Sequence, residues 1–217
     1  EVVAMVENYG IAIVYLGRGS GAFLDAPRVT LRSPYGIAAG DWNEDGRTDL
    51  LVYYWGRPPI AFLRLPGARR PGAPLAAGAW RPLDVAPAGG RWDTNALTSA
   101  DVDGDGHLDL IVGNYFPDGS RILDANAGGK EHMHRSMSRS ENGGVNRLLL
   151  WQSAGPETVT YRDVPDALDP QTTLSWTLAV GAADLDGDLR PEIYFGNDFG
   201  NDRLLHNRST PGHPRLV

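Results

Sequence analysis

The sequence of 217 residues is 41% hydrophobic and has a formal net charge of −7, which allows one or two domains with a packed core. No run approaches the ~18 consecutive apolar residues that span a bilayer, and no basic stripe with interleaved aromatic residues indicates nucleic-acid binding. The chain has no cysteine, so disulfides and thiol chemistry are excluded.

The first predicted strand, residues 11–16, leads through a Gly-rich turn and is interpreted as the end of a preceding repeat that covers residues 1–30. Three segments then align without gaps, starting at Asp41, Asp101 and Asp184. Each follows a run of small residues, continues into an apolar strand and reaches a second apolar run. Short β-branched and aromatic runs between Gly, Pro, Asn and Asp are typical of strands and turns, so we predict an all-β fold.

The starts of these segments are 60 and 83 residues apart, a spacing that fits four short strands and therefore one blade of a β-propeller. We predict a partial propeller of three to four blades out of about seven. The predicted repeats are residues 31–92, residues 93–170 with a long connection at 114–145, and residues 171–217. A partial ring leaves blade faces uncovered, so we expect the same precursor or another chain to supply the remaining blades. Residues 1–217 alone are not expected to form a stable monomer.

Each aligned segment begins with a loop that suits Ca²⁺, a hard cation that takes six to eight oxygen ligands. Oxygen-bearing side chains stand at positions 1, 3 and 5, a backbone carbonyl at position 7 and a carboxylate at position 9. The predicted ligands are Asp41, Asn43, Asp45, the Arg47 carbonyl and Asp49; Asp101, Asp103, Asp105, the His107 carbonyl and Asp109; and Asp184, Asp186, Asp188, the Arg190 carbonyl and Glu192. Eleven of the 27 acidic residues are thus predicted ligands, and without a cation their carboxylates would repel one another.

The EF-hand starts with the same pattern but needs a bidentate Glu at position 12 and a helix on each side. Position 12 is Val52, Val112 or Phe195 here, each in a predicted strand, so the EF-hand is excluded. The third loop departs from the other two because Leu189 stands where they have Gly, and Pro191 follows the carbonyl position. We predict calcium in all three loops, with the third the least regular.

The three segments resemble the FG-GAP/VCBS repeats of integrin-type propellers. The text around them, Phe116-Pro-Asp-Gly-Ser and Gly196-Asn-Asp-Phe-Gly-Asn-Asp-Arg-Leu-Leu-His-Asn, resembles bacterial relatives of cartilage acidic protein, the ASPIC/UnbV group. The resemblance covers most of residues 31–210. It implies an integrin-like propeller in which each calcium loop joins the first and second strands of a blade.

In such a blade the connection between the second and third strands emerges on the opposite face. The connection at 114–145 is long for a compact domain, and connections of this length are usually functional or disordered. With neighbouring loops it supplies the candidate catalytic residues His132, His134, Arg135, Arg139, Asp93 and Asp198. A histidine can act as acid or base near neutral pH, and aromatic residues such as Trp92 and Trp176 can stack on a planar ligand. For the two histidines a solvated loop and a transition-metal pair stay open as alternatives.

The resemblance implies a bacterial protein of natural-product biosynthesis, of the enediyne type, that binds or transforms a polycyclic small molecule. If it is an enzyme, the chemistry would be acid/base or ring-forming and independent of a redox cofactor. The alternative is a secreted adhesion or scaffold module with a protein or glycan partner, and a purely structural part of a larger protein is a third. The first would place it in the bacterial cytoplasm, the second outside the cell.

Overall fold

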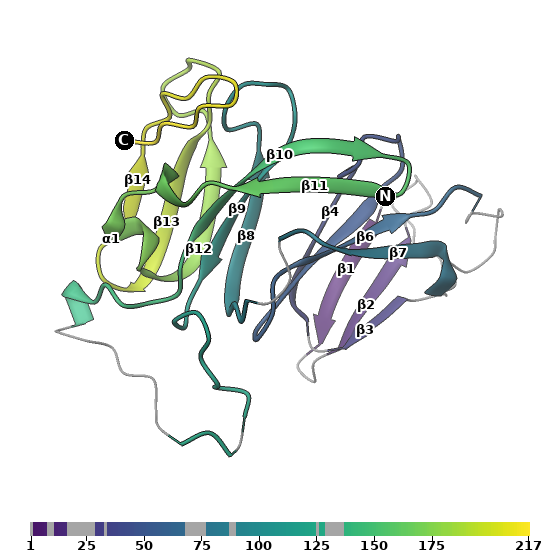
Figure 1. The fold of residues 1–217 in the computed structure, drawn as a ribbon, viewed down its shortest axis with the longest axis horizontal. Helices are drawn as coiled ribbons and strands as arrows, with labels where there is room; N and C mark the ends of the chain where they lie inside the picture. Colours follow the sequence, from purple (N-terminus) through teal and green to yellow (C-terminus); the bar gives the residue numbers. More distant parts are fainter. Residues whose placement is uncertain are drawn as a thin grey trace. The chain divides into compact units, whose positions relative to one another are not determined.

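The computed structural model describes residues 2–7, 11–16, 29–32, 34–67, 77–86, 90–124, 126–128 and 137–217. The chain divides into two compact units, which are described separately. The first comprises Glu1–Tyr54, Pro59–Val85 and Ser153–Thr160, and the second comprises Trp55–Pro58, Ala86–Gln152 and Tyr161–Val217. Four sheets account for the strands (Figure 1), which supports the predicted all-β, β-propeller-like fold.

The first unit contains a three-stranded sheet, ordered β1-β2-β3, and a four-stranded sheet, ordered β4-β5-β6-β7. Their strands are β1 (Val2–Glu7), β2 (Ile11–Leu16), β3 (Val29–Arg32), β4 (Pro34–Gly40), β5 (Asp49–Tyr54), β6 (Ile60–Arg64) and β7 (Trp80–Asp84). A 3-10 turn, Ala77–Ala79, precedes β7. Leu50, Leu51 and Val52 of β5 are buried, as expected of a continuous apolar run in a strand covered on both faces.

The second unit holds the sheet ordered β11-β10-β9-β8 and the three-stranded sheet β12-β13-β14. The strands are β8 (Thr94–Ala100), β9 (Asp109–Asn114), β10 (Arg147–Gly155), β11 (Thr158–Asp163), β12 (Trp176–Ala183), β13 (Glu192–Phe199) and β14 (Arg203–Leu205). The end of the β10–β11 hairpin, residues 153–160, belongs to the first unit. Short helical turns lie at Met137–Arg139, Pro165–Ala167 and α1 (Pro170–Thr173), and no described helix is long and apolar enough to cross a membrane.

The core of the second unit lies between its two sheets. Apolar side chains from β9, β10 and β13 form one buried cluster that includes Ile111, Leu148 and Phe195. The sheets approach closely at Gly113, where a Cβ atom would lie 2.6 Å from Thr177 Cγ2 and 2.7 Å from Val180 Cγ2. A glycine is therefore needed on β9 where β12 packs against it.

The three acidic segments occupy the same topological place. Residues 41–48 join β4 to β5, residues 101–108 join β8 to β9, and residues 184–191 join β12 to β13. In each case the loop connects the first and second strands of an antiparallel sheet. The connections from the second strand to the third lie at the other end of that strand.

Candidate functional site

The three acidic loops share an unusual backbone conformation, with left-handed residues at positions 4 and 6. At position 4 the φ angles are 59° for Glu44, 77° for Gly104 and 79° for Gly187. At position 6 they are 81° for Gly46, 93° for Gly106 and 68° for Leu189. Left-handed backbone favours glycine because a Cβ atom crowds the following carbonyl oxygen. Only the second loop has glycine at both positions.

The same hydrogen bonds hold each loop closed. The carboxylate at position 1 accepts from the amide at position 6: Gly46 N to Asp41 (2.7 Å), Gly106 N to Asp101 (2.9 Å) and Leu189 N to Asp184 (3.0 Å). The carboxylate at position 5 accepts from the amide at position 7: Arg47 N to Asp45 (2.9 Å), His107 N to Asp105 (2.9 Å) and Arg190 N to Asp188 (3.0 Å). The aligned sequences therefore form one loop structure three times.

The carboxylate at position 9 ties each loop to the third strand of its sheet or to the residues that follow that strand. Its oxygens accept from the amide at position 2 and from a second backbone amide: Trp42 and Arg64 for Asp49, Val102 and Trp151 for Asp109, and Leu185 and Asn207 for Glu192. All three carboxylates are buried. Burial raises the pKa of Asp49 to about 6 and that of Asp109 to about 7, and the neighbouring loop carboxylates add to the rise.

Oxygen atoms gather inside the loops at distances that suit a cation. Carboxylate oxygens of Asp101, Asp103 and Asp109 lie within 4.8 Å of one another, as do those of Asp184, Asp186 and Asp188. In the first loop Asn43 is buried, and among the described residues its Oδ1 atom has no hydrogen-bond partner. A cation would satisfy this acceptor and offset the repulsion among the buried carboxylates. Because the donors are nearly all oxygen atoms, the set suits Ca²⁺.

The third loop differs from the first two in its surroundings. The residue at position 2 is buried in the first two loops, where Trp42 is 3% and Val102 0% exposed. In the third loop this residue is Leu185, which is 65% exposed. At position 3, Asn43 donates to the carbonyls of Gly155 and Pro156, in the turn between β10 and β11. Asp103 at this position accepts from Gly212 N (2.7 Å), in the turn near the C-terminus. Asp186, by contrast, is exposed and accepts from the Arg208 guanidinium (3.2 Å).

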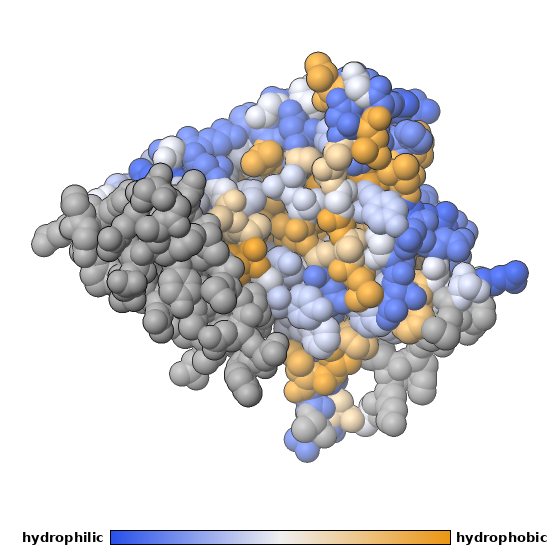
Figure 2. All heavy atoms as spheres, turned by 180° about the vertical axis from the view of Figure 1, so that it is seen from behind, coloured by the Kyte–Doolittle hydropathy of each residue, from blue (hydrophilic) through white to orange (hydrophobic). Residues whose placement is uncertain are grey.

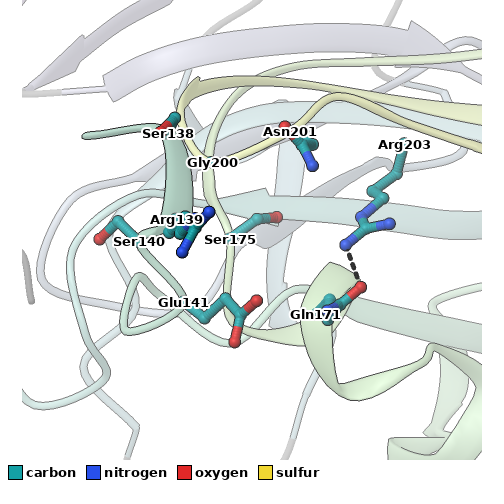
Figure 3. Close-up of a pocket in the computed structure, with 9 residues that line it drawn as sticks. All are labelled: Ser138, Arg139, Ser140, Glu141, Gln171, Ser175, Gly200, Asn201 and Arg203. Carbon is teal, nitrogen blue, oxygen red and sulfur yellow. Dashed lines mark hydrogen bonds between the residues drawn. The ribbon is translucent and has the colours of Figure 1, made fainter. Parts of the chain in front are cut away.

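At the other end of the second unit's sheets lies a polar pocket of about 280 Å³ (Figure 3). It is formed by the segment 138–141, by α1 with Ser175, and by the β13–β14 connection with the first residue of β14. The lining residues are Ser138, Arg139, Ser140, Glu141, Gln171, Ser175, Gly200, Asn201 and Arg203. Arg203 donates to the side chain of Gln171, the contact drawn as a dashed line in Figure 3. Two arginines, one glutamate and several hydroxyl and amide groups make the pocket suited to a polar ligand.

A buried network centred on Asn146 holds Ser175, one of the residues that line this pocket. Its side-chain amide donates to Thr172 O (2.8 Å), Ser175 Oγ (2.9 Å) and Thr177 Oγ1 (2.7 Å). Its Oδ1 atom accepts from the backbone amide of Asn114 (2.7 Å). One side chain therefore fixes the end of β9 and the residues that enter β12, and a fully bonded polar network of this kind keeps a single arrangement.

The aromatic residues at this end of the sheets pack against one another. The Trp176 ring meets Tyr115, Phe116 and Phe199 edge to face, with centroids 5.1, 5.9 and 5.8 Å away. The predicted stacking residue Trp92 is buried, and the Cζ atom of the Arg147 guanidinium lies over its ring, 4.4 Å from the ring centroid. None of these rings lines the pocket.

The predicted catalytic residues are distributed as follows. Arg139 lines the pocket, whereas Asp198 accepts from the Tyr115 hydroxyl (2.6 Å) and is not part of the lining. Asp93 is fully buried, accepts from Gly56 N (3.0 Å) and is not part of the lining either. His132, His134 and Arg135 lie outside the described residues.

Sequence reasoning did not identify Gln171, Ser175, Asn201 or Arg203, although all four line the pocket. They come from segments far apart in the chain, and no spacing pattern links them. Only the expected topology could have indicated them, because it places the loops opposite the acidic loops at one end of the sheets.

Comparison with known proteins gives two family matches. Residues 1–52 match the FG-GAP-like repeat family, and residues 94–130 match the FG-GAP repeat family. These ranges include the first and second acidic loops, and neither extends to Asp184–Glu192. A comparison with curated proteins finds no match. With the antiparallel sheets, the two matches support an FG-GAP, integrin-like repeat protein with a β-propeller-like fold.

Proposed function

We propose that this chain is a calcium-stabilised propeller module with an adhesion or scaffold role, whose binding face lies opposite the calcium loops. The observation that carries the proposal is the shared closure of the acidic loops around clustered oxygen atoms. The two FG-GAP matches are consistent with such a module. Calcium would be held by positions 1, 3, 5 and 9 and by the carbonyl at position 7.

Calcium binding would stabilise the fold because the ion binds the folded loops and not the unfolded chain. A site with free calcium at 100 times its Kd contributes about 2.7 kcal/mol. For a protein of this size, 1 kcal/mol raises the Tm by about 2–4 °C, so two sites should raise it by about 10 °C or more.

Thermal unfolding with and without a chelator tests this proposal. EDTA should lower the Tm, and Ca²⁺ should restore it more effectively than Mg²⁺, which demands a tighter octahedral geometry. If the Tm stays unchanged after elemental analysis has shown the metal to be gone, calcium has no structural role here.

The module would also need further blades. On the sheet β12-β13-β14, Ile193, Phe195 and Leu205 face the core cluster, whereas Leu178, Tyr194 and Leu204 are 42–47% exposed. In Figure 2 exposed hydrophobic residues lie among polar ones on the described surface. An additional blade, from a longer precursor or another chain, would cover this sheet face. Size-exclusion chromatography with mass spectrometry tests this, and a folded, monodisperse species of about 23.5 kDa would contradict it.

The pocket supports a small, polar and acidic ligand group. Its volume of about 280 Å³ is just below the usual range for ligand sites, and the described residues that line it include no aromatic or large apolar side chain that would contact a polycyclic molecule. The pocket therefore favours the carboxylate of a partner protein or glycan over the polycyclic intermediate that the ASPIC/UnbV resemblance suggests. The second candidate function is a biosynthetic role. Its support is that Arg139, a predicted catalytic residue, lines a pocket at the end of the sheets opposite the acidic loops.

Ligand titration separates the two candidates. Glucuronate should bind in calorimetry, uncharged glucose should bind more weakly, and Arg139→Gln should reduce the affinity for glucuronate. Binding of a polycyclic probe such as anthraquinone, with no response to glucuronate, would favour the biosynthetic candidate instead.

A further inference from the structure

The side chain of Arg208, which follows β14, lies against the carboxylates of the third acidic loop. The Arg208 guanidinium donates from Nη2 to Asp186 (3.2 Å) and from Nη1 to Asp188 (3.3 Å), so it bridges the carboxylates at positions 3 and 5. Nη1 also donates to the carbonyl of Asn207 (2.9 Å), which fixes the guanidinium at this place. Because an arginine presents several donors in one plane, it can bind two carboxylates at once.

The first two loops have no basic residue at the place of Arg208. The amides that reach position 9 come from Arg64, Trp151 and Asn207. The next residue along the chain is Leu65 in the first loop, Gln152 in the second and Arg208 in the third. The bridging arginine is therefore specific to the third loop.

The other charged groups near these carboxylates do not bridge them. Arg190 reaches only Asp188, at 3.7 Å, and a nitrogen of His206 lies within 4.8 Å of oxygens of Asp186 and Glu192. In the first loop Arg47 pairs with Asp45, but the residue at position 3 is Asn43, which carries no charge. Only Arg208 spans positions 3 and 5 in any described loop.

We infer that Arg208 supplies in the third loop the positive charge that Ca²⁺ supplies in the first two, so that the chain holds two calcium ions. The donor set of the third loop fits calcium less well, because an ion would have to displace a guanidinium bound to two of its ligands. The exposure of these ligands also lowers the gain from pairing them with a metal. This inference rests on the proposed calcium binding of the first two loops.

The calcium-to-protein ratio tests the inference. The full chain, purified with any partner that accompanies it, is stripped with EDTA, saturated with Ca²⁺ and measured by equilibrium dialysis with radioactive calcium. The wild type should hold two ions and Arg208→Gln should hold three. Arg190→Gln is the matched control, because it removes one positive charge beside the same carboxylates but leaves Arg208 in place, and it should still hold two.

Several results would overturn the inference. The first three are a wild type that holds three ions, an Arg208→Gln variant that holds two, and three ions in both Arg208→Gln and Arg190→Gln. The fourth is a third site in Arg208→Gln that binds Zn²⁺ in preference to Ca²⁺ through Asp186, Glu192 and His206. A wild-type ratio of zero would contradict the proposed function, and the inference would then depend on whether Arg208→Gln adds one ion. If Arg208→Gln does not fold, substitutions in the wild-type background decide: Asp186→Asn should leave the ratio at two, whereas Asp103→Asn should lower it to one.

Discussion

Replacing Leu189 with glycine should stabilise the protein. Leu189 has a φ of 68° and is 91% exposed, so its side chain contributes almost no burial that the change would remove. A residue with a Cβ atom costs about 1–2 kcal/mol in the left-handed region. Glycine restores about 0.4–1 kcal/mol of conformational entropy to the unfolded chain, which offsets part of the gain. We expect Leu189→Gly to raise the free energy of unfolding by about 0.5–1 kcal/mol, and the Tm by about 1–4 °C.

The measurement is urea unfolding in EDTA, so that metal binding does not contribute. Leu189→Ala is the matched control, because it removes the exposed side chain but keeps the Cβ atom, and it should leave stability nearly unchanged. Gly106→Ala makes the opposite change at the same position of the second loop, where a Cβ atom would meet nothing within 4 Å. It should lower stability by about the amount that Leu189→Gly adds.

The reasoning would be refuted if Leu189→Ala stabilised the protein as much as Leu189→Gly. The gain would then come from removing an exposed apolar side chain and not from the backbone. A neutral Gly106→Ala would also contradict it, because the two loops share one backbone conformation.

Four other substitutions give direct tests. Asp103→Ala should lower the free energy of unfolding in urea by about 1–3 kcal/mol, because it leaves the amide of Gly212 unpaired. Asp186→Ala should lower it by at most about 1 kcal/mol, because it removes only an exposed ion pair. Equal losses for the two variants would contradict this difference. Asn146→Ala should cost about 2–3 kcal/mol and weaken glucuronate binding, and a loss below about 1 kcal/mol would show that the network does not hold the pocket. Asp169→Ala should cost about 1 kcal/mol at pH 7, because the Asp169 side chain caps α1. Burial raises the pKa of Asp169, but hydrogen bonds from Thr172 and two backbone amides outweigh burial and lower the pKa overall. The stability difference between Asp169→Ala and the wild type should therefore shrink as the pH falls below about 4. A difference that stays constant with pH would refute the capping role of Asp169.

The acidic loops were predictable from sequence because their structure is local. Position 1 accepts from position 6 and position 5 accepts from position 7, all within a few residues, so the spacing of Asp and Gly determines the turn. The departure at Leu189 was visible for the same reason, and the structure shows its consequence as a left-handed backbone without glycine. The antiparallel sheets followed from the short apolar runs and their turn residues.

The partners of these loops were not predictable in the same way. Arg208 lies 20 residues from Asp188 and Gly212 lies 109 residues from Asp103, and no spacing rule connects such pairs. The pocket has the same origin, since Arg139 and Arg203 come together only through the packing of two sheets. Asp93 is an ionisable residue at the expected end of the sheets, but its side chain is buried and accepts a hydrogen bond from the Gly56 amide.

In the first two acidic loops the residue at position 3 bonds to a turn from later in the chain. This contact relates the proposed calcium binding to the need for further blades. Gly155 in a later hairpin covers position 3 of the first loop, and Gly212 in a later turn covers that of the second. The third loop has no such cover among the described residues, and Asp186 bonds to Arg208 instead. A turn from an additional blade would approach Asp186 from the side on which Asp103 receives Gly212. An amide donated by that turn would compete with Arg208 for Asp186, so the third loop is where blade addition and cation binding would influence each other.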